Sequence, residues 1–143
     1  MKFPRYRLVL GAAGFAALAA LGGYAVGAAA HSEGEKVTPI YTQKLASAPG
    51  KSLTAITVDY APGGVSGPHH HTKSGEVFAY VVSGAIRSKV NDEPEKVYKA
   101  GEFWYEPPGS AHGVSANASS TEPARLVAVF VADDGANLTT FDQ

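Results

Sequence analysis

Short segments in which apolar and polar residues alternate fill most of the chain from residue 38 onward. The clearest is Val77–Val82 (VFAYVV), which is rich in β-branched and aromatic residues and therefore predicts a β-strand. Weaker alternation predicts further strands at residues 38–45, 52–60, 85–90, 97–99 and 102–106. A continuous apolar run at residues 126–132 predicts a strand that is buried on both faces.

Turn-forming glycines and prolines separate these segments, and none of the segments has the 3.6-residue period of an amphipathic helix. Residues 61–64 (APGG), for example, predict a turn. Many short strands between such turns predict an all-β fold, an antiparallel barrel or sandwich. The strands place this domain at residues 38–132, between a polar linker at residues 31–37 and a polar tail at residues 133–143.

The strand predicted at Val77–Val82 also indicates that one outer face of the domain carries aromatic side chains. If Val77 and Ala79 face the interior, alternation turns Phe78 and Tyr80 outward. Exposed aromatic side chains on a strand are typical of a surface that is covered by another segment or by a partner subunit. We therefore expect a homodimer.

The first thirty residues have the composition of an export signal. The basic residues Lys2, Arg5 and Arg7 precede an apolar, glycine-rich run from Leu8 to Ala30 that ends in three alanines, the small-residue pattern of a cleavage site. The run is also long enough to span a bilayer, so a signal peptide and an uncleaved N-terminal transmembrane anchor are both open. Either one makes the protein periplasmic or secreted, or anchored in the inner membrane and facing the periplasm.

The net charge and the composition of the chain limit the classes of partner that it can bind. The twelve Lys and Arg, less the three before residue 8, leave nine against thirteen Asp and Glu, so the exported part has a formal net charge of −4. A mildly acidic domain has no general attraction for nucleic acid or for an anionic membrane surface. The membrane is expected as a partner only if the N-terminal segment is uncleaved. The chain has no cysteine, which excludes disulfides and thiolate metal sites.

A run of three histidines, His69 to His71, follows the predicted turn at residues 61–64. On a strand His69 and His71 share one face, so both imidazoles can bind one metal ion, while His70 points the other way. The candidate third ligand is His112, which follows a Pro-Pro-Gly turn, and Glu76 is a candidate fourth. Imidazoles with or without a carboxylate suit one divalent transition metal (Fe, Mn, Co, Ni, Cu or Zn) and leave coordination positions open.

These two clusters resemble the two sequence motifs of the cupin family. The first motif, G-x5-H-x-H-x3,4-E-x6-G, is matched by Gly63, His69, His71, Glu76 and Gly84. The second, G-x5-P-x-G-x2-H-x3-N, is matched by Gly101, Pro107, Gly109, His112 and, one position late, Asn117. The resemblance covers roughly residues 40–132 and implies an antiparallel jelly-roll β-barrel. It says much less about the reaction, because it includes dioxygenases, isomerases and lyases.

One departure from the first motif concerns Glu76. Seven residues separate Glu76 from Gly84, where the family has six, so counting back from Gly84 puts the glutamate position at Val77. Neighbouring strand residues face opposite ways. Either a β-bulge returns Glu76 to the metal, or Glu76 points away and the site consists of three histidines. The two other nearby carboxylates, Glu102 and Glu106, are interpreted as solvated groups at the edge of a strand.

Two functions from different classes fit these observations. The first is an exported metal-dependent enzyme, dioxygenase-like, acting on a small organic substrate; the chain offers no candidate general base besides Glu76, which favours chemistry carried by the metal. The alternative is a non-enzymatic module that binds or senses a small ligand or a metal. Metal-dependent turnover of a substrate distinguishes the two.

Overall fold

The computed structural model describes residues 32–143. Within that range the chain forms ten β-strands and no helix, and hence no helix that could cross a membrane. The strands are β1 (Glu33–Lys44), β2 (Lys51–Ser66), β3 (His69–His71), β4 (Glu76–Ser83), β5 (Ala85–Val90), β6 (Lys96–Lys99), β7 (Phe103–Glu106), β8 (Ala111–Asn117), β9 (Ala124–Asp133) and β10 (Thr139–Phe141). The all-β prediction is confirmed. The predicted export segment, residues 1–30, lies outside the described residues.

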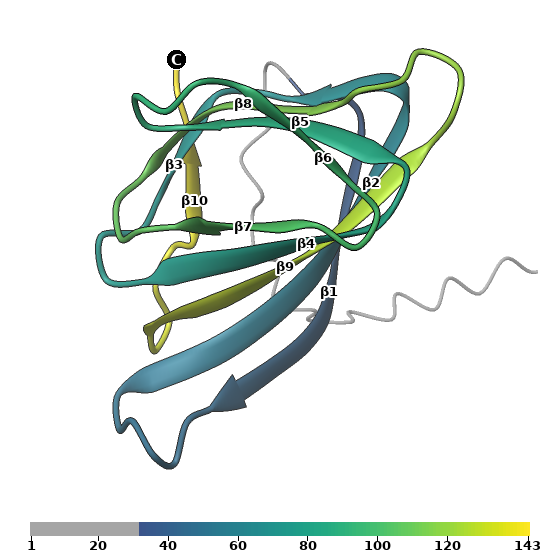
Figure 1. The fold of residues 1–143 in the computed structure, drawn as a ribbon. Coiled ribbons are helices and arrows are strands. Elements are labelled where there is room, and N and C mark those ends of the chain that lie inside the picture. The colour runs from purple at the N-terminus through teal and green to yellow at the C-terminus, as the bar shows by residue number, and fades with distance from the viewer. Residues whose placement is uncertain (1–31) are drawn as a thin grey trace, which may run out of the picture.

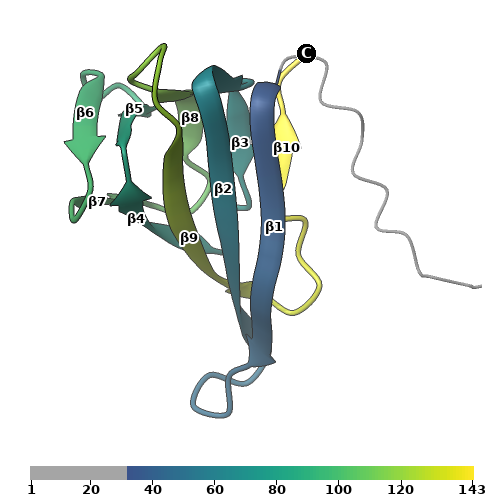
Figure 2. The ribbon, with the colours of Figure 1, turned by 90° about the vertical axis from the view of Figure 1, so that its right-hand side faces the viewer.

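The strands form two antiparallel layers that face each other across the interior (Figures 1 and 2). One layer has the order β1-β2-β9-β4-β7 and the other has the order β10-β3-β8-β5-β6. The layers are joined where the end of β2 pairs with β8, at Val65 opposite Ala116 and Ser66 opposite Ser115. The result is a nearly closed antiparallel barrel, consistent with a jelly roll.

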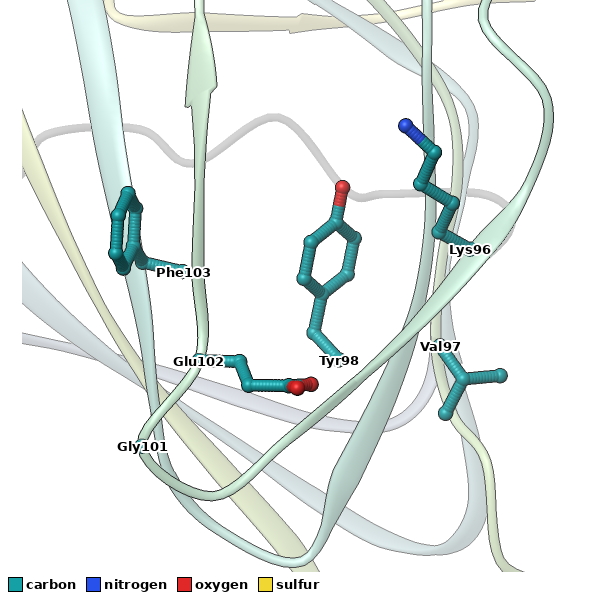
Figure 3. Close-up of a pocket in the computed structure, with 6 residues that line it drawn as sticks. All are labelled: Lys96, Val97, Tyr98, Gly101, Glu102 and Phe103. Carbon is teal, nitrogen blue, oxygen red and sulfur yellow. The ribbon is translucent and has the colours of Figure 1, made fainter.

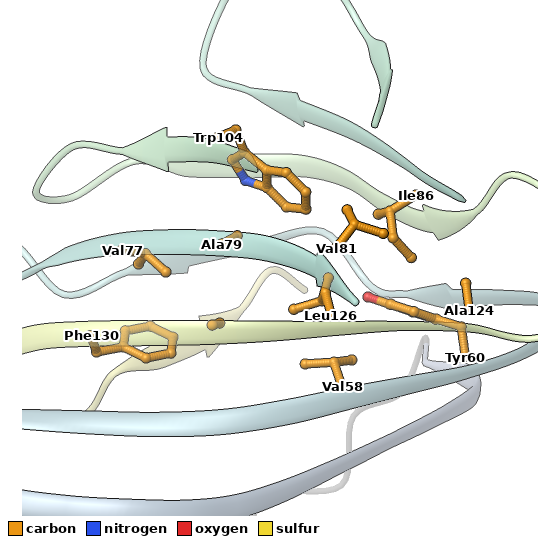
Figure 4. Close-up of a cluster of buried hydrophobic side chains, with 11 residues drawn as sticks. Val58, Tyr60, Val77, Ala79, Val81, Ile86, Trp104, Ala124, Leu126 and Phe130 are labelled. Atoms are coloured by element: carbon orange, nitrogen blue, oxygen red, sulfur yellow. The ribbon is translucent and has the colours of Figure 1, made fainter. Parts of the chain in front are cut away.

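The hydrophobic core fills the space between the layers (Figure 4). On β4 the predicted alternation is present, because Val77 and Ala79 are buried whereas Phe78 and Tyr80 are exposed. The other buried members of the core are Val58, Tyr60, Val81, Ile86, Trp104, Ala124, Leu126, Ala128 and Phe130. The side chains that alternation turns inward from the two layers thus share one interior.

The apolar run at residues 126–132 forms the middle of β9, which lies between β2 and β4. Its residues alternate between buried and half-buried along the strand. Both edges of β9 are therefore paired, and its second face is partly covered, which explains why polar residues are missing from this segment.

Two segments that were expected to be irregular belong to strands. Residues 33–37, expected as a linker, form the start of β1, and residues 61–64, expected as a turn, lie within β2. A Cβ atom at Gly64 would lie only 2.7 Å from the carbonyl oxygen of Gly34. The two strands approach closely here because both positions lack a side chain, and the register shifts at this point. The glycines therefore permit an irregular strand pair rather than ending the strand.

The expected polar tail also contains a strand. β10 pairs with β3, with Thr139 opposite His71 and Phe141 opposite His69. The last described residues thus cover the histidine-bearing strand along its free edge.

Candidate metal centre

Strand pairing brings His112 next to His69 and His71, which are far from it in the sequence. β3 and β8 are neighbours, and His69 lies directly opposite His112. His71 lies on the same face as His69, as alternation predicts, whereas His70 is exposed with its Nδ1 2.6 Å from an oxygen of Asp142.

The three side chains are buried and converge on one point. The exposed fraction is 7% for His69, 8% for His71 and 4% for His112. The ring centroid of His69 lies 4.9 Å from that of His71 and 5.0 Å from that of His112. Each ring offers one nitrogen to a group in which all ligand atoms lie within 4.8 Å of one another. Such a group could hold one metal ion.

Backbone carbonyls orient two of the rings. Nδ1 of His69 donates to the carbonyl oxygen of Gly67 at 2.8 Å, and Nδ1 of His71 donates to that of Leu138 at 3.0 Å. A carbonyl oxygen can only accept a hydrogen bond, so each Nδ1 carries the hydrogen. In the neutral rings Nε2 then keeps a free lone pair, the state that a metal ligand requires.

Burial also keeps two of the three histidines neutral. Desolvation lowers the pKa of His112 to about 4, and the nearby His69 and His71 act in the same direction. Desolvation likewise lowers the pKa of His69. Nε2 of His112 lies 2.9 Å from the hydroxyl of Ser88, which can donate or accept. His69 and His112 are therefore unprotonated near pH 7 and available as ligands.

A carboxylate reaches the cluster from the opposite layer. Glu106 of β7 is only 2% exposed, with Oε2 3.1 Å from Nε2 of His71 and Oε1 3.3 Å from Nδ1 of His112. Burial by itself would raise the pKa of Glu106, but the interactions with His71 and His112 outweigh it, so the pKa is below its usual value. The sequence interpretation of Glu106 as a solvated edge residue is wrong. Trp104, two residues earlier on the same face, is the signal that could have identified it.

Glu76, the expected fourth ligand, is not part of this group. It is exposed on β4, and one of its oxygens accepts a hydrogen bond from the hydroxyl of Tyr105 at 2.6 Å. Its neighbour Val77 is the buried residue, and the only register shift between β4 and β9 falls later, between Val81 and Ser83. No bulge at Glu76 turns this side chain inward, so the histidines do not gain a carboxylate from β4.

Asn117, the last residue of the second motif, supports a loop instead of the metal group. Its side-chain amide donates to the carbonyls of Ala61 and Glu122, and its oxygen accepts from the backbone N–H of Ser119. These bonds fix the connection between β8 and β9.

Two surface pockets lie beside β6 and β7. The larger, of about 520 Å³, is lined by Lys96, Val97, Tyr98, Gly101, Glu102 and Phe103 and contains none of the histidines (Figure 3). The smaller, of about 250 Å³, is lined in part by Ser88 and Trp104. Ser88 contacts His112, and the indole N–H of Trp104 donates to Glu106 at 2.9 Å. The smaller pocket also contains none of the histidines, but two of its lining residues contact His112 and Glu106.

The fold and the site together describe one class of protein: a two-layer antiparallel β-barrel with a candidate metal site of histidines on two adjacent strands. The family model for the cupin domain matches residues 56–130, which is more than half of the chain, and the chain belongs to this family. The resemblance inferred from the motifs is thereby confirmed.

Similar proteins include a germin-like protein (subfamily 2 member 2) of Arabidopsis thaliana, 32% identical over 101 residues. That match covers 68% of this chain and 45% of the relative, so the chain spans about half the length of the curated relatives it matches. Among solved structures, oxalate oxidase in complex with the substrate analogue glycolate has a TM-score of 0.58 and 26% identity, covering 76% of this chain and 55% of the other. A variant of oxalate decarboxylase from B. subtilis has a TM-score of 0.52 and 26% identity, covering 63% and 24%.

Proposed function

We propose that this cupin binds one divalent transition metal (Fe, Mn, Ni, Cu or Zn) through His69, His71 and His112, and that it is a metal-dependent, oxygenase-like enzyme acting on a small organic substrate. The observation that carries the proposal is the convergence of three buried imidazoles from two adjacent strands. Imidazole nitrogens are common ligands of such metals, and three rings that offer nitrogen atoms to one place suit a shared cation.

The residues present fit such an ion. Two of the three rings present a nitrogen lone pair because a backbone carbonyl holds the hydrogen on the other nitrogen. Oε2 of Glu106, also at the cluster, is a buried oxygen without a hydrogen-bond donor among the described residues. A redox-active metal at this place would supply O₂ activation, whereas Zn would supply Lewis-acid chemistry.

The chain's own residues would bind and orient the substrate. The pocket of about 250 Å³ has room for a small molecule next to Ser88 and Trp104, and its polar lining includes Lys96 and Glu93. The likeness to oxalate oxidase suggests small carboxylic acids as the first substrate class to test, and the cation of Lys96 is suited to such an anion. Ser88 would connect the bound molecule with the ring of His112.

The test is a turnover assay with the metal-loaded protein. Oxalate, glycolate, a catechol and a β-diketone are each incubated with it, and O₂ consumption and loss of substrate are measured. We expect metal-dependent loss of at least one compound, abolished in His69→Ala and His112→Ala. Tight binding of a compound or of the metal without any turnover would instead support the alternative, a binding or sensing module.

Two further parts of the proposal concern where the protein acts and how it assembles. We propose an exported protein, periplasmic or secreted if residues 1–30 are cleaved and anchored in the inner membrane if they are not. We also propose a homodimer, supported by exposed aromatic side chains on adjacent strands. These are Phe78 and Tyr80 of β4 and Phe103 and Tyr105 of β7.

A further inference from the structure

Glu106 lies opposite the position on β4 at which the first cupin motif, counted back from Gly84, has its glutamate. β4 and β7 are paired with Val77 directly opposite Glu106, and both residues are buried. Residues directly opposite each other on antiparallel strands project to the same face with their Cβ atoms about 4.5–5.5 Å apart. A carboxylate on β7 at this position therefore reaches the same interior space as one at residue 77 on β4, where this chain has valine.

The surroundings of Glu106 hold its carboxylate at the histidines. The indole N–H of Trp104 donates to Oε1 at 2.9 Å, which leaves Oε2 without a donor among residues 32–143. Oε2 lies 3.1 Å from Nε2 of His71, and the hydrogen of that ring is already given to Leu138. Two lone pairs would face each other at this distance, so a positive charge, either an extra proton or a metal ion, has to lie between them.

The distances from Glu106 to two of the three histidines match those between two ligands of one ion. Ligand atoms about 2.1 Å from a metal, at angles between about 90° and 110°, are separated by about 3.0–3.4 Å. The two contacts of Glu106, with Nε2 of His71 and with Nδ1 of His112, measure 3.1 and 3.3 Å. Nε2 of His112 is at the same time within 2.9 Å of the Ser88 hydroxyl, which can accept its hydrogen.

We propose that Glu106 is the fourth protein ligand of the metal centre, a carboxylate supplied by β7 across the strand ladder in place of one on β4. This inference rests on the proposed function, because it assumes that the three histidines bind a metal. It makes the ligand set three neutral imidazoles and one anion, with two ligand-bearing strands in one layer and one in the other. The alternative role for Glu106 is an ion pair with a protonated His71 and no bond to the metal.

The direct test is a crystal structure of the full-length protein loaded with Zn²⁺. We expect a carboxylate oxygen of Glu106 at a bonding distance of about 2.0–2.2 Å from zinc, together with the three histidine nitrogens. Zinc bound by the histidines with Glu106 turned away would overturn this inference and leave the proposed function intact. No zinc at the histidines would overturn both.

Substitutions give an independent test, in which metal affinity and folding are measured separately for each variant. The variant Glu106→Gln keeps the shape of the side chain and an acceptor for Trp104, and Glu76→Gln makes the same change at the exposed carboxylate. Zn²⁺ affinity is measured by competition with a chelator, and the fold of each metal-free variant is checked by circular dichroism. Loss of a residue that only supports a ligand costs about 10–100-fold in affinity, so we expect more than about 100-fold for Glu106→Gln and no change for Glu76→Gln. Equal affinities for the two variants would contradict the inference.

A rescue variant separates a ligand from a supporting residue. Adding Val77→Glu to Glu106→Gln returns a carboxylate to the same interior space from the opposite strand. We expect the double variant to bind Zn²⁺ at least about tenfold more tightly than Glu106→Gln alone, because the anion is restored to the ligand set. If the double variant does not fold, the crystal structure of the zinc-loaded protein decides the question by itself.

Discussion

At the scale of single residues, the site depends on three histidines buried inside the barrel, of which His69 and His112 have a lowered pKa. Phe130 packs against the ring of His71 at 5.3 Å and Phe141 against that of His69 at 5.5 Å. These contacts help to exclude water from the rings, and burial lowers the pKa of His69 and of His112. The lowered pKa has a consequence for stability that can be measured without any metal.

The metal-free protein should lose stability as the pH falls from about 6.5 to about 4. The pKa of His112 is lowered to about 4 by burial, whereas in the unfolded chain it has its usual value of 6.5. Between these values the unfolded state binds more protons, so the stability present above pH 6.5 is lost as the pH decreases. We expect a decrease on the order of 2 kcal/mol, measured by urea denaturation at pH 7 and pH 4.5.

The matched variant for this prediction is His112→Asn, which removes the titrating ring. Its free energy of unfolding should depend less steeply on pH than that of the unchanged protein. An identical pH dependence in the two proteins would show that His112 is not held neutral by burial.

At the scale of elements, the fold is predictable where alternation is strong and unpredictable where pairing alone makes a strand. Val77–Val82 was predicted correctly because its β-branched and aromatic residues alternate between core and surface. β10 has only three residues and no apolar pattern, and its pairing with β3 depends on neighbours more than sixty residues away. No local pattern reveals such an edge strand.

In the candidate site too, some residues are predicted by the local sequence pattern and others are placed only by strand pairing. The positions of His69 and His71 follow from strand alternation, and His112 follows from the turn before it. The burial of Glu106 depends on where β7 lies in the barrel, and this is set by pairing with β4 rather than by its own segment. The inward position of Trp104 was a usable signal, because residues two apart on a strand share a face.

Removing β10 should weaken metal binding. A chain that ends at Ala136 lacks the Leu138 carbonyl that orients His71 and the Phe141 ring that covers His69. Losing such supporting contacts costs about 10–100-fold in metal affinity, which chelator competition measures. Thr140→Ala is the control, because Thr140 is exposed opposite the outward His70 and its loss should leave the affinity unchanged. Unchanged affinity in the shortened chain would mean that β10 has no role at the site.

At the scale of the whole molecule, the layer that ends in β7 presents an aromatic outer face. Tyr105 lies opposite Phe78, and Phe103 opposite Tyr80, on the paired strands β4 and β7. The rings of Phe78 and Phe103 are 5.4 Å apart, and the side chains of Tyr80 and Tyr105 are exposed on the same two strands. Such a surface suits a second copy of the chain better than water.

Replacing the two phenylalanines should therefore change the oligomeric state. We expect the unchanged protein to sediment as a dimer and Phe78→Ser/Phe103→Ser as a monomer in analytical ultracentrifugation. The control is Ile40→Ser/Tyr41→Ser on β1, at the other edge of the same layer, where both side chains are 54% exposed. A monomeric unchanged protein, or a dimer that survives the phenylalanine changes, would contradict this surface as the interface.

The central claim, a metal held by the three histidines, is tested most directly by elemental analysis of the protein purified without a histidine tag and without added metal. We predict about one transition-metal ion per chain, and none in His69→Ala/His112→Ala. Metal that remains in the double variant would contradict the site, and a protein that retains no metal even after reconstitution would contradict the proposed metal-dependent function.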